Sequence, residues 1–499
     1  MDITVIGRGG GPAAGGSPAR GAAPGDGAAR VDGAARVFDR PDVPADPAVL
    51  AELSAQVSGA DLAAPPVVLP DFHHKSTMEI PSSVAVATVG TVRPSFTSAS
   101  VNCGMALLAL DCDRPGRAGI DEFYRRVRER YPYPAGTGRE LTAREVRAAA
   151  VDGSRFAAQR FDVDADELAR IEESGRIDLA RYGGAERLVR ELPGLAFQLA
   201  RLRFGTVGPS NHFIELQVVE QIYDEAVAAR LGVRAGQLTL QYHAGGGVLT
   251  GEIGALFGRR KHYPRQLRLA MAVQKPLFHL ATARSYGELR RRLALYFARG
   301  CPPVDRDSAE GQRLLLANAA AMNYGFAFRT ATYAALRRIA ADVFGGSGGR
   351  LVVDSPHNSI YEEPLGNGET AVVHRHNSCR AYPAQRCPAG TVFAETGQAV
   401  LLPGTCRTSS YLAVAGPRAA DSLHSACHGA GTLVADFAAT GRSATHPEGH
   451  TTLRFRYTDA APEQVTHLDD NGVNAAAGVL VDHGLVRPVA RMRPFAVLN

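Results

Sequence analysis

The sequence predicts an α+β fold built as one large unit. Short apolar runs with the length and composition of strands occur along the chain, and longer stretches whose apolar residues recur every three to four positions separate them. An apolar fraction of 45% in 499 residues supplies enough side chains for a sizeable core. We find neither an internal repeat nor a linker that would divide the chain, so we expect one domain after the N-terminal segment.

The N-terminal segment differs in composition from the rest of the chain. Residues 8–35 are mostly glycine, alanine, proline and arginine, with almost no large apolar side chains. Such a segment cannot bury enough surface to offset the entropy of ordering its backbone. We therefore predict a disordered tail over residues 1–40 and a folded domain over residues 41–499.

The first half of the folded domain mixes strands and helices. An amphipathic helix is expected over 45–58, and the apolar runs at 67–69 and 84–89 are typical of buried strands. Residues 115–204 are predicted to be mainly helical, because they combine charged helix faces with apolar spacing near 3.6 at 185–203.

The second half begins with a cluster of breaker residues. Glycine and proline at 205–210 precede Asn211 and His212 and lead into a strand at 213–219. A long helix, or a pair of helices, is expected over 314–341. Further strands are expected at 238–242, 351–354, 371–374, 399–402 and 411–414.

Composition also narrows the cellular context. No run approaches the roughly 18 consecutive apolar residues of a membrane-spanning helix. The start of the chain lacks the basic and apolar regions of a signal peptide. Seven cysteines in a long chain indicate free thiols in a reducing compartment, and a net charge of +5 is compatible with an anionic partner without predicting nucleic acid. We expect a cytoplasmic monomer that does not associate with membranes.

The stretch 425–431, Ser-Ala-Cys-His-Gly-Ala-Gly, is the centre of the functional argument. Its small side chains leave room for a second group to approach the imidazole of His428, and glycine allows backbone N–H groups to converge on an anion. Four other small-residue stretches carry a cysteine or histidine, and we expect the fold to bring all five together. The cysteine and the histidines that these four stretches carry are Cys103, His212, His243 and His357.

A thiolate and imidazoles are suitable ligands for Zn²⁺, Mn²⁺, Fe²⁺ or Co²⁺. No zinc-finger spacing joins the four residues, so ordinary core or loop positions are the alternative to a metal site. Each lies next to asparagine or glycine where a strand is predicted to meet a loop, and enzymes often place working groups there. The context favours a metal site, whereas the spacing alone leaves both interpretations open.

Together with further motifs in the same chain order, these stretches resemble the RtcB family of RNA-splicing ligases. The resemblance implies a single large domain of mixed or antiparallel sheets flanked by helices, with the active site in a central cleft. It extends from about residue 65 to the C-terminus. The matching stretches are 69–73, 102–105, 205–215, 242–243, 321–324, 357–358, 373–375, 403–411, 427–431 and 489–494.

The resemblance implies a GTP-dependent ligase that joins an RNA 3′-phosphate or 2′,3′-cyclic phosphate to a 5′-hydroxyl with one or two Mn²⁺ ions. His428 would attack the α-phosphate of GTP and become guanylylated. The guanylate would pass to the RNA 3′-phosphate, and the 5′-hydroxyl would then displace GMP. A neutral imidazole, with an ordinary pKa of about 6.5, is available as a nucleophile at neutral pH.

The resemblance also assigns roles to individual residues. Asp71 matches a carboxylate that orients the nucleophilic histidine. The matches to the family's manganese ligands are Cys103, His212, His243 and His357. The matches to its nucleotide contacts are Asn211, Glu215, Asn358, Ser410, Ala430 and Gly431.

The chain departs from the family pattern at several positions. Ser100 stands where the family has an aspartate that helps to hold the second metal ion. Gly247 and Thr432 replace arginines, and Asn499 aligns with a near-terminal lysine that contacts the nucleotide. The chain is therefore a divergent relative.

Three alternatives to ligation follow from these departures. The first is a paralogue that retains metal and nucleotide binding, or guanylylation, without ordinary ligation. The second is a metal-dependent phosphohydrolase that uses the same site with water as the nucleophile. The third is a non-catalytic RNA-binding protein.

Overall fold

The computed structural model describes residues 29–32, 35–133, 140–201, 204, 207–208, 211–261, 265–366, 368–458 and 460–499. Most of the predicted tail and of the breaker cluster at 205–210 lies outside these residues. Strands β1 (Arg30–Asp32) and β2 (Ala35–Val37) fall inside the segment 1–40 that we expected to be disordered. Val37 and Phe38 are fully buried, which explains why the fold begins before residue 41.

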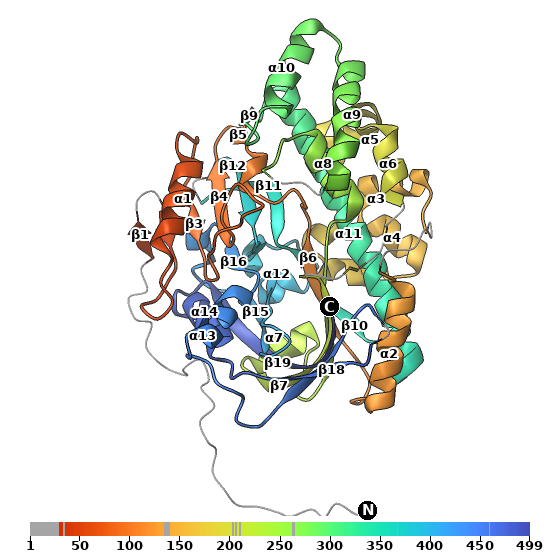
Figure 1. Ribbon diagram of the computed structural model, residues 1–499, viewed down its shortest axis with the longest axis vertical. Helices are drawn as coiled ribbons and strands as arrows, with labels where there is room; N and C mark the ends of the chain where they lie inside the picture. Colours follow the sequence, from red (N-terminus) through yellow and green to blue (C-terminus); the bar gives the residue numbers. More distant parts are fainter. Residues whose placement is uncertain are drawn as a thin grey trace, which may run out of the picture.

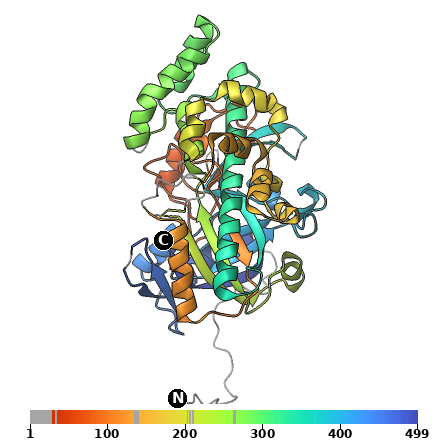
Figure 2. The ribbon, with the colours of Figure 1, turned by 90° about the vertical axis from the view of Figure 1, so that its right-hand side faces the viewer.

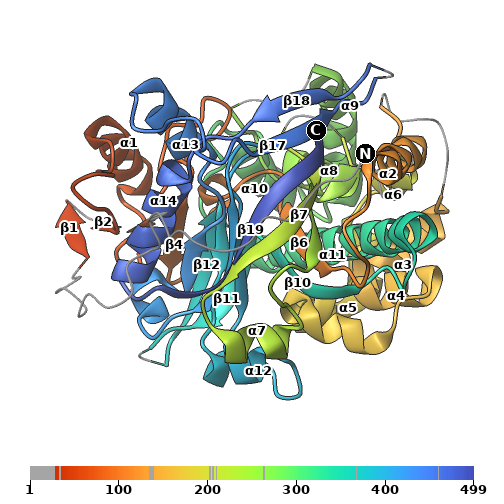
Figure 3. The ribbon, with the colours of Figure 1, turned by 90° about the horizontal axis from the view of Figure 1, so that it is seen from below.

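Two sheets form the framework, and most neighbouring strands are antiparallel, as the α+β prediction required (Figures 1 and 3). In spatial order the six-stranded sheet comprises β1, β2, β3 (Val67–Val68), β4 (Val84–Thr88), β12 (Thr370–His376) and β11 (Asn358–Pro364). The nine-stranded sheet comprises β10 (Arg350–Pro356), β6 (Gly104–Ala109), β8 (Leu238–Ala244), β7 (Phe213–Ile222), β19 (Val486–Leu498), β15 (Ser410–Ala415) and β14 (Ala399–Leu402), with β17 (Thr451–Phe455) and β18 (Glu463–Thr466) added beside β19. Two small pairs are β13 (Ser378–Arg380) with β16 (Ser425–Cys427) and β5 (Thr91–Val92) with β9 (Val304–Asp305).

Helices lie on both sides of the sheets (Figure 3). One group comprises α1 (Pro47–Val57), α13 (Gly431–Ala439) and α14 (Asn471–Asp482). The other comprises α11 (Ala309–Phe344) and, within the stretch 115–204, α2 (Arg117–Arg130), α3 (Ala143–Asp152), α4 (Ser154–Phe161), α5 (Gly184–Glu191) and α6 (Gly194–Ala200). The remaining helices are α7 (Glu225–Leu231), α8 (Gly247–Leu256), α9 (Arg265–Thr282), α10 (Tyr286–Tyr296) and α12 (Phe393–Thr396). Among the described residues, no helix combines the length and the hydropathy needed to cross a membrane.

Helix α11 is the longest element and supports the site from one side (Figure 2). The Ser308 hydroxyl caps its N-terminus by accepting a hydrogen bond from the N–H of Gly311 at 3.0 Å. Every residue from Leu314 to Ala334 is buried, as expected of a helix that is apolar or small on all faces. We expected one long helix or two over 314–341, and the structure has one.

Strand β6 lies in the interior of the nine-stranded sheet and is buried on both faces. Ala106 and Leu108 point into the apolar cluster that contains the side chains of α11. Met105 and Leu107 point into a second cluster on the opposite face, formed with β10, β14, β15 and β19. Cys103, the residue just before β6, is therefore held in place by the side chains that pack on both faces of this strand.

Candidate functional site

The fold brings the predicted metal ligands to one end of the nine-stranded sheet. Cys103 directly precedes β6, His212 directly precedes β7, His243 lies near the end of β8, and His357 follows β10. Because these neighbouring strands are antiparallel, the start of one coincides with the end of the next. The paired positions are Gly104 with Ala244, Gly104 with Pro356, and Phe213 with His243.

Their side chains form a compact cluster. The Sγ atom of Cys103 lies 3.2 Å from Nε2 of His243 and 3.6 Å from Nε2 of His212. The ring of His243 lies 4.9 Å, centroid to centroid, from the rings of both His212 and His357. One candidate ligand atom each from Cys103, His243 and His357 lies within 4.8 Å of the other two.

Burial keeps these imidazoles neutral at physiological pH. It lowers the pKa of His212 to about 4 and the pKa values of His243 and His357 well below the ordinary range. Burial also raises the pKa of the Cys103 thiol to about 12. Neutral imidazole is the form that coordinates a metal ion, and a bound ion would stabilise the thiolate.

The hydrogen bonds around the cluster fit a metal ion. Nδ1 of His243 lies 2.7 Å from the carbonyl oxygen of Asn211 and donates to it, which leaves the lone pair of Nε2 directed toward Cys103. Nδ1 of His357 is buried and has no hydrogen-bond partner among the described residues. A buried ring nitrogen without a partner is costly in an empty site and is satisfied by coordination.

A buried ion pair supports the loop that carries Cys103. The Arg329 guanidinium of α11 donates from Nε to both oxygens of Asp354, at 2.9 and 3.0 Å, and from Nη2 to Oδ1 at 2.6 Å. Its Nη1 donates to the carbonyl oxygen of Asn102. Asn102 has a φ of 58°, in the left-handed region that asparagine tolerates better than most residues. Helix α11 therefore fixes the backbone immediately before the thiol.

Glycines allow the close approaches that this geometry requires. A Cβ atom at Gly104 would lie 2.7 Å from the carbonyl oxygen of Ser355, and one at Gly245 would lie 3.0 Å from Cε1 of His212. Around His428 the situation is different, because a Cβ atom at Gly431 would meet nothing within 4 Å. There the glycine faces open space, which belongs to a cavity.

His428 lies beside the cluster rather than within it. It directly follows β16, whose Cys427 pairs with Ser378 of β13, and the N–H of Ser378 donates to the carbonyl oxygen of His357 at 3.0 Å. The His428 ring lies 4.2 Å, centroid to centroid, from the ring of His357. Burial lowers its pKa to about 3, so the imidazole is neutral.

A cavity of about 380 Å³ opens next to His428. Six of the residues to which the sequence analysis assigned a catalytic, nucleotide-binding or metal-binding role line it, namely Asp71, Asn211, Glu215, His243, His428 and Gly431. Asn358 and Ser410 are buried and position its wall, since the Asn358 side chain accepts from the N–H of Asn377 at 3.0 Å and the Ser410 hydroxyl accepts from that of Gly404 at 3.2 Å. Ala430 is fully buried before α13.

Asp71 has different partners from the one we expected. Its carboxylate accepts a hydrogen bond from the N–H of Leu433 in the first turn of α13, at 2.8 Å. Burial raises the pKa of Asp71 to about 7, although the Leu433 hydrogen bond opposes this rise. Asp71 thus lines the same cavity as His428 and anchors helix α13, which follows His428 in the chain.

The sequence analysis missed several residues that line the cavity. Lys75 supplies a cation there, and its charge contributes to the lowered pKa of His428. Asn377 and Cys406 line the same space. Lys75 follows Asp71 by four residues in one loop, so its proximity to a predicted site residue was the available signal.

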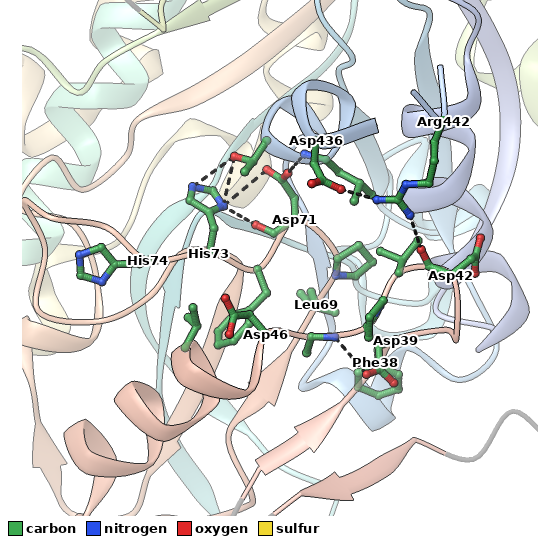
Figure 4. Close-up of a pocket in the computed structure, with 18 residues that line it drawn as sticks. Phe38, Asp39, Asp42, Asp46, Leu69, Asp71, His73, His74, Asp436 and Arg442 are labelled. Atoms are coloured by element: carbon green, nitrogen blue, oxygen red, sulfur yellow. Dashed lines mark hydrogen bonds and ion pairs between the residues drawn. The ribbon is translucent and has the colours of Figure 1, made fainter. Parts of the chain in front are cut away.

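A second cavity, of about 420 Å³, lies on the other side of Asp71 and shares His73 and Thr432 with the first (Figure 4). Its lining is acidic, with carboxylates from Asp39, Asp42, Asp46, Asp71 and Asp436. Its arginine, Arg442, already pairs with Asp436 and donates to the carbonyl oxygen of Asp42. These carboxylates would repel phosphate groups, whereas the cavity beside His428 is also lined by the cation Lys75.

Comparison with known proteins agrees with this arrangement. The family model for tRNA-splicing ligase RtcB matches residues 55–499. The chain belongs to the RtcB family. Among RtcB relatives, the tRNA-splicing ligase RtcB of Archaeoglobus fulgidus is 28% identical over 86% of this chain and 86% of its own length.

Two further RtcB relatives differ in length. The RNA-splicing ligase RtcB of Mycobacterium tuberculosis is 29% identical over 86% of this chain and 96% of its own length. The tRNA-splicing ligase RtcB of Pyrococcus furiosus is 28% identical over 79% of this chain, and this match spans only 39% of the relative.

Proposed function

We propose that this RtcB-family protein is an RNA ligase that joins a 3′-phosphate or 2′,3′-cyclic phosphate end to a 5′-hydroxyl end, with GTP as co-substrate. The observation that carries the proposal is the position of His428. Its neutral ring lies 4.2 Å from His357 of the thiol–imidazole cluster and borders a cavity of about 380 Å³. This arrangement supports the proposal, because the proposed nucleophile lies between the thiol–imidazole cluster and a space large enough for a small ligand.

The chain's own groups support each stage of this reaction. A ring nitrogen of His428 attacks the α-phosphorus of GTP, and the bond to pyrophosphate breaks as the N–P bond forms. Lys75 lines the cavity and meets the negative charge of the phosphates. Asn211 and Glu215 line the same wall, and Glu215, whose pKa burial raises to about 8, can donate a hydrogen bond from its protonated form.

The later stages of the reaction use the N–P bond formed on His428. The guanylate moves from His428 to the RNA 3′-phosphate, and attack by the 5′-hydroxyl then releases GMP and closes the strand. We propose that Cys103, His212, His243 and His357 hold Mn²⁺. When bound, the ion would neutralise phosphate charge and orient the reacting groups.

The test is a labelling experiment on the whole chain. The protein is incubated with GTP labelled at the α-phosphate and with Mn²⁺, and is then denatured. We expect a label on the protein that survives alkali, is lost in acid, and is absent from His428→Ala. His74→Ala is the matched control, because His74 is an exposed histidine paired with Glu52 at 2.7 Å.

Other results would favour the alternatives. Release of inorganic phosphate without a protein label would point to a phosphohydrolase. Salt-sensitive RNA binding without any effect of nucleotide would point to an RNA-binding protein. A label without joining of RNA ends would identify a paralogue that retains guanylylation alone.

A further inference from the structure

A second group of potential metal ligands lies away from the cavity beside His428. The loop between α13 and β17 carries the sequence His446-Pro447-Glu448-Gly449-His450. It forms a tight turn, in which the N–H of Gly449 donates to the carbonyl oxygen of His446 at 3.0 Å and Gly449 adopts a φ of 65°. The turn directs three side chains with metal-binding atoms to one side, and the proposed ligation reaction uses none of them.

The ligand atoms of His446, Glu448 and His450 all lie within 4.8 Å of one another. Nε2 of His450 is 2.7 Å from a Glu448 oxygen, and the rings of His446 and His450 are 4.7 Å apart, centroid to centroid. Ligands of a tetrahedral zinc ion lie roughly 3.3 Å from one another, given bond lengths of about 2.0–2.1 Å. Nδ1 of His446 also accepts a hydrogen bond from the N–H of Glu448 at 3.2 Å, so either this contact breaks or the ring turns when the three bind one ion.

His467 adds an independent observation. It is fully buried, and its backbone is paired with the turn, since its carbonyl oxygen accepts from the N–H of His446 at 3.0 Å and its N–H donates to His450 at 2.9 Å. Nε2 of His467 pairs with the Thr452 hydroxyl at 2.6 Å, whereas Nδ1 is buried without a partner among the described residues. Its ring lies 6.0 Å, centroid to centroid, from that of His450, so a buried imidazole with an unsatisfied nitrogen borders the turn.

The surrounding charges are compatible with a dication. Arg493 is the nearest cation, but it pairs with Glu220 and with Asp470, the latter at 2.9 Å. Arg491 also pairs with Glu220, at 3.4 Å. With Glu448 included, three carboxylates face two guanidinium groups, which leaves one negative charge to compensate the ion.

The ligand set at this site also limits which ion can bind. Two imidazoles with one carboxylate form a ligand set that suits Zn²⁺ and excludes the hard cations Ca²⁺ and Mg²⁺.

We propose that His446, Glu448 and His450 form a second transition-metal site, selective for Zn²⁺ and distinct from the Cys103 cluster. The partly exposed side of the turn leaves a coordination position for water. The bound ion rigidifies the turn at 446–450, which directly precedes β17. This role is structural and is independent of the ligation reaction.

The test counts metal sites on the intact chain. Protein stripped with a chelator is titrated with Co²⁺ and then with Zn²⁺, and the bound metal is measured per chain. We expect two equivalents in the wild-type protein, of which only one shows thiolate-to-cobalt charge-transfer absorption. His446→Ala/His450→Ala should lose one equivalent and keep the thiolate absorption.

Two further variants complete the experiment. Glu448→Gln should weaken the thiolate-free site at least about tenfold, and because its side chain is 70% exposed the substitution leaves the fold intact. His74→Ala removes an imidazole that also lies 2.7 Å from a carboxylate but belongs to neither proposed ligand set, so it should leave the count at two. A wild-type count of one, or a double variant that retains both equivalents, would overturn the proposal.

Discussion

Removal of the Arg329 guanidinium should destabilise the protein in a way that depends on pH. Arg329 is fully buried, and Asp354, at 1% exposure, makes its ion pair with this side chain. Burial raises the pKa of Asp354, and Arg329 opposes that rise. In Arg329→Met the carboxyl loses this compensation and takes up a proton instead.

The size of the effect follows from proton linkage. Keeping a carboxyl protonated costs about 1.4 kcal/mol for each pH unit above an ordinary aspartate pKa of about 3.9. The free energy of unfolding should therefore fall by about 4 kcal/mol at pH 7 but by only about 1.5 kcal/mol at pH 5. Because the Asp354 carboxyl has a raised pKa in the variant, the folded variant is more stable at low pH and loses stability as the pH rises.

Urea unfolding of the metal-free protein at both pH values measures this difference. Arg337→Met is the control, because Arg337 lies on the same helix in a half-exposed position and pairs with Asp164 at 3.9 Å, so its loss should change stability by less than about 1 kcal/mol. Arg329→Met/Asp354→Leu should recover most of the stability. An equal loss at pH 5 and pH 7 would refute the argument that Asp354 becomes a buried, unpaired acid.

Three further predictions concern the neighbourhood of the site. Gly104→Ala places a Cβ atom 2.7 Å from the Ser355 carbonyl oxygen and should lower the free energy of unfolding, measured by urea titration, by about 1–3 kcal/mol. The control is Gly251→Ala, whose Cβ atom meets nothing within 4 Å and which should be neutral or stabilising in the same titration. Gly245→Ala should displace the His212 ring and weaken metal binding by about tenfold or more in a competition titration, and unchanged affinity would show that His212 is not a ligand. Burial raises the pKa of Glu252 to about 8, so stability should fall between pH 4.5 and pH 8, and Glu252→Gln should stabilise the protein by a few kcal/mol at pH 8 and little at pH 5.

The clustering of the four candidate metal ligands could be predicted from the sequence because the signal was local. Each of Cys103, His212, His243 and His357 was predicted to lie where a strand meets a loop, and the antiparallel register of β6, β7, β8 and β10 brings those ends together. Helix α11 was predicted from its own composition, since apolar and small residues dominate the stretch and no proline interrupts it. Local patterns were sufficient in both cases.

The features that were missed depend on contacts between distant segments. Nothing near Asp71 in the sequence indicates that its carboxylate accepts from the N–H of Leu433, 362 residues away. Strand β2 was assigned to a tail because of the composition around it, yet it pairs with β3 and buries Val37. In each case tertiary packing decided the outcome, and the surrounding composition did not show it.

The assembly of the Cys103 cluster from four separate strands has a consequence for the order of folding. Its members are drawn from positions 103 to 357, so no short segment of the chain contains more than one of them. Loop closure over such distances must precede coordination, and an ion added to the unfolded chain finds no preformed site. The sheet has to assemble first, and the ion then locks a framework that backbone pairing has already built.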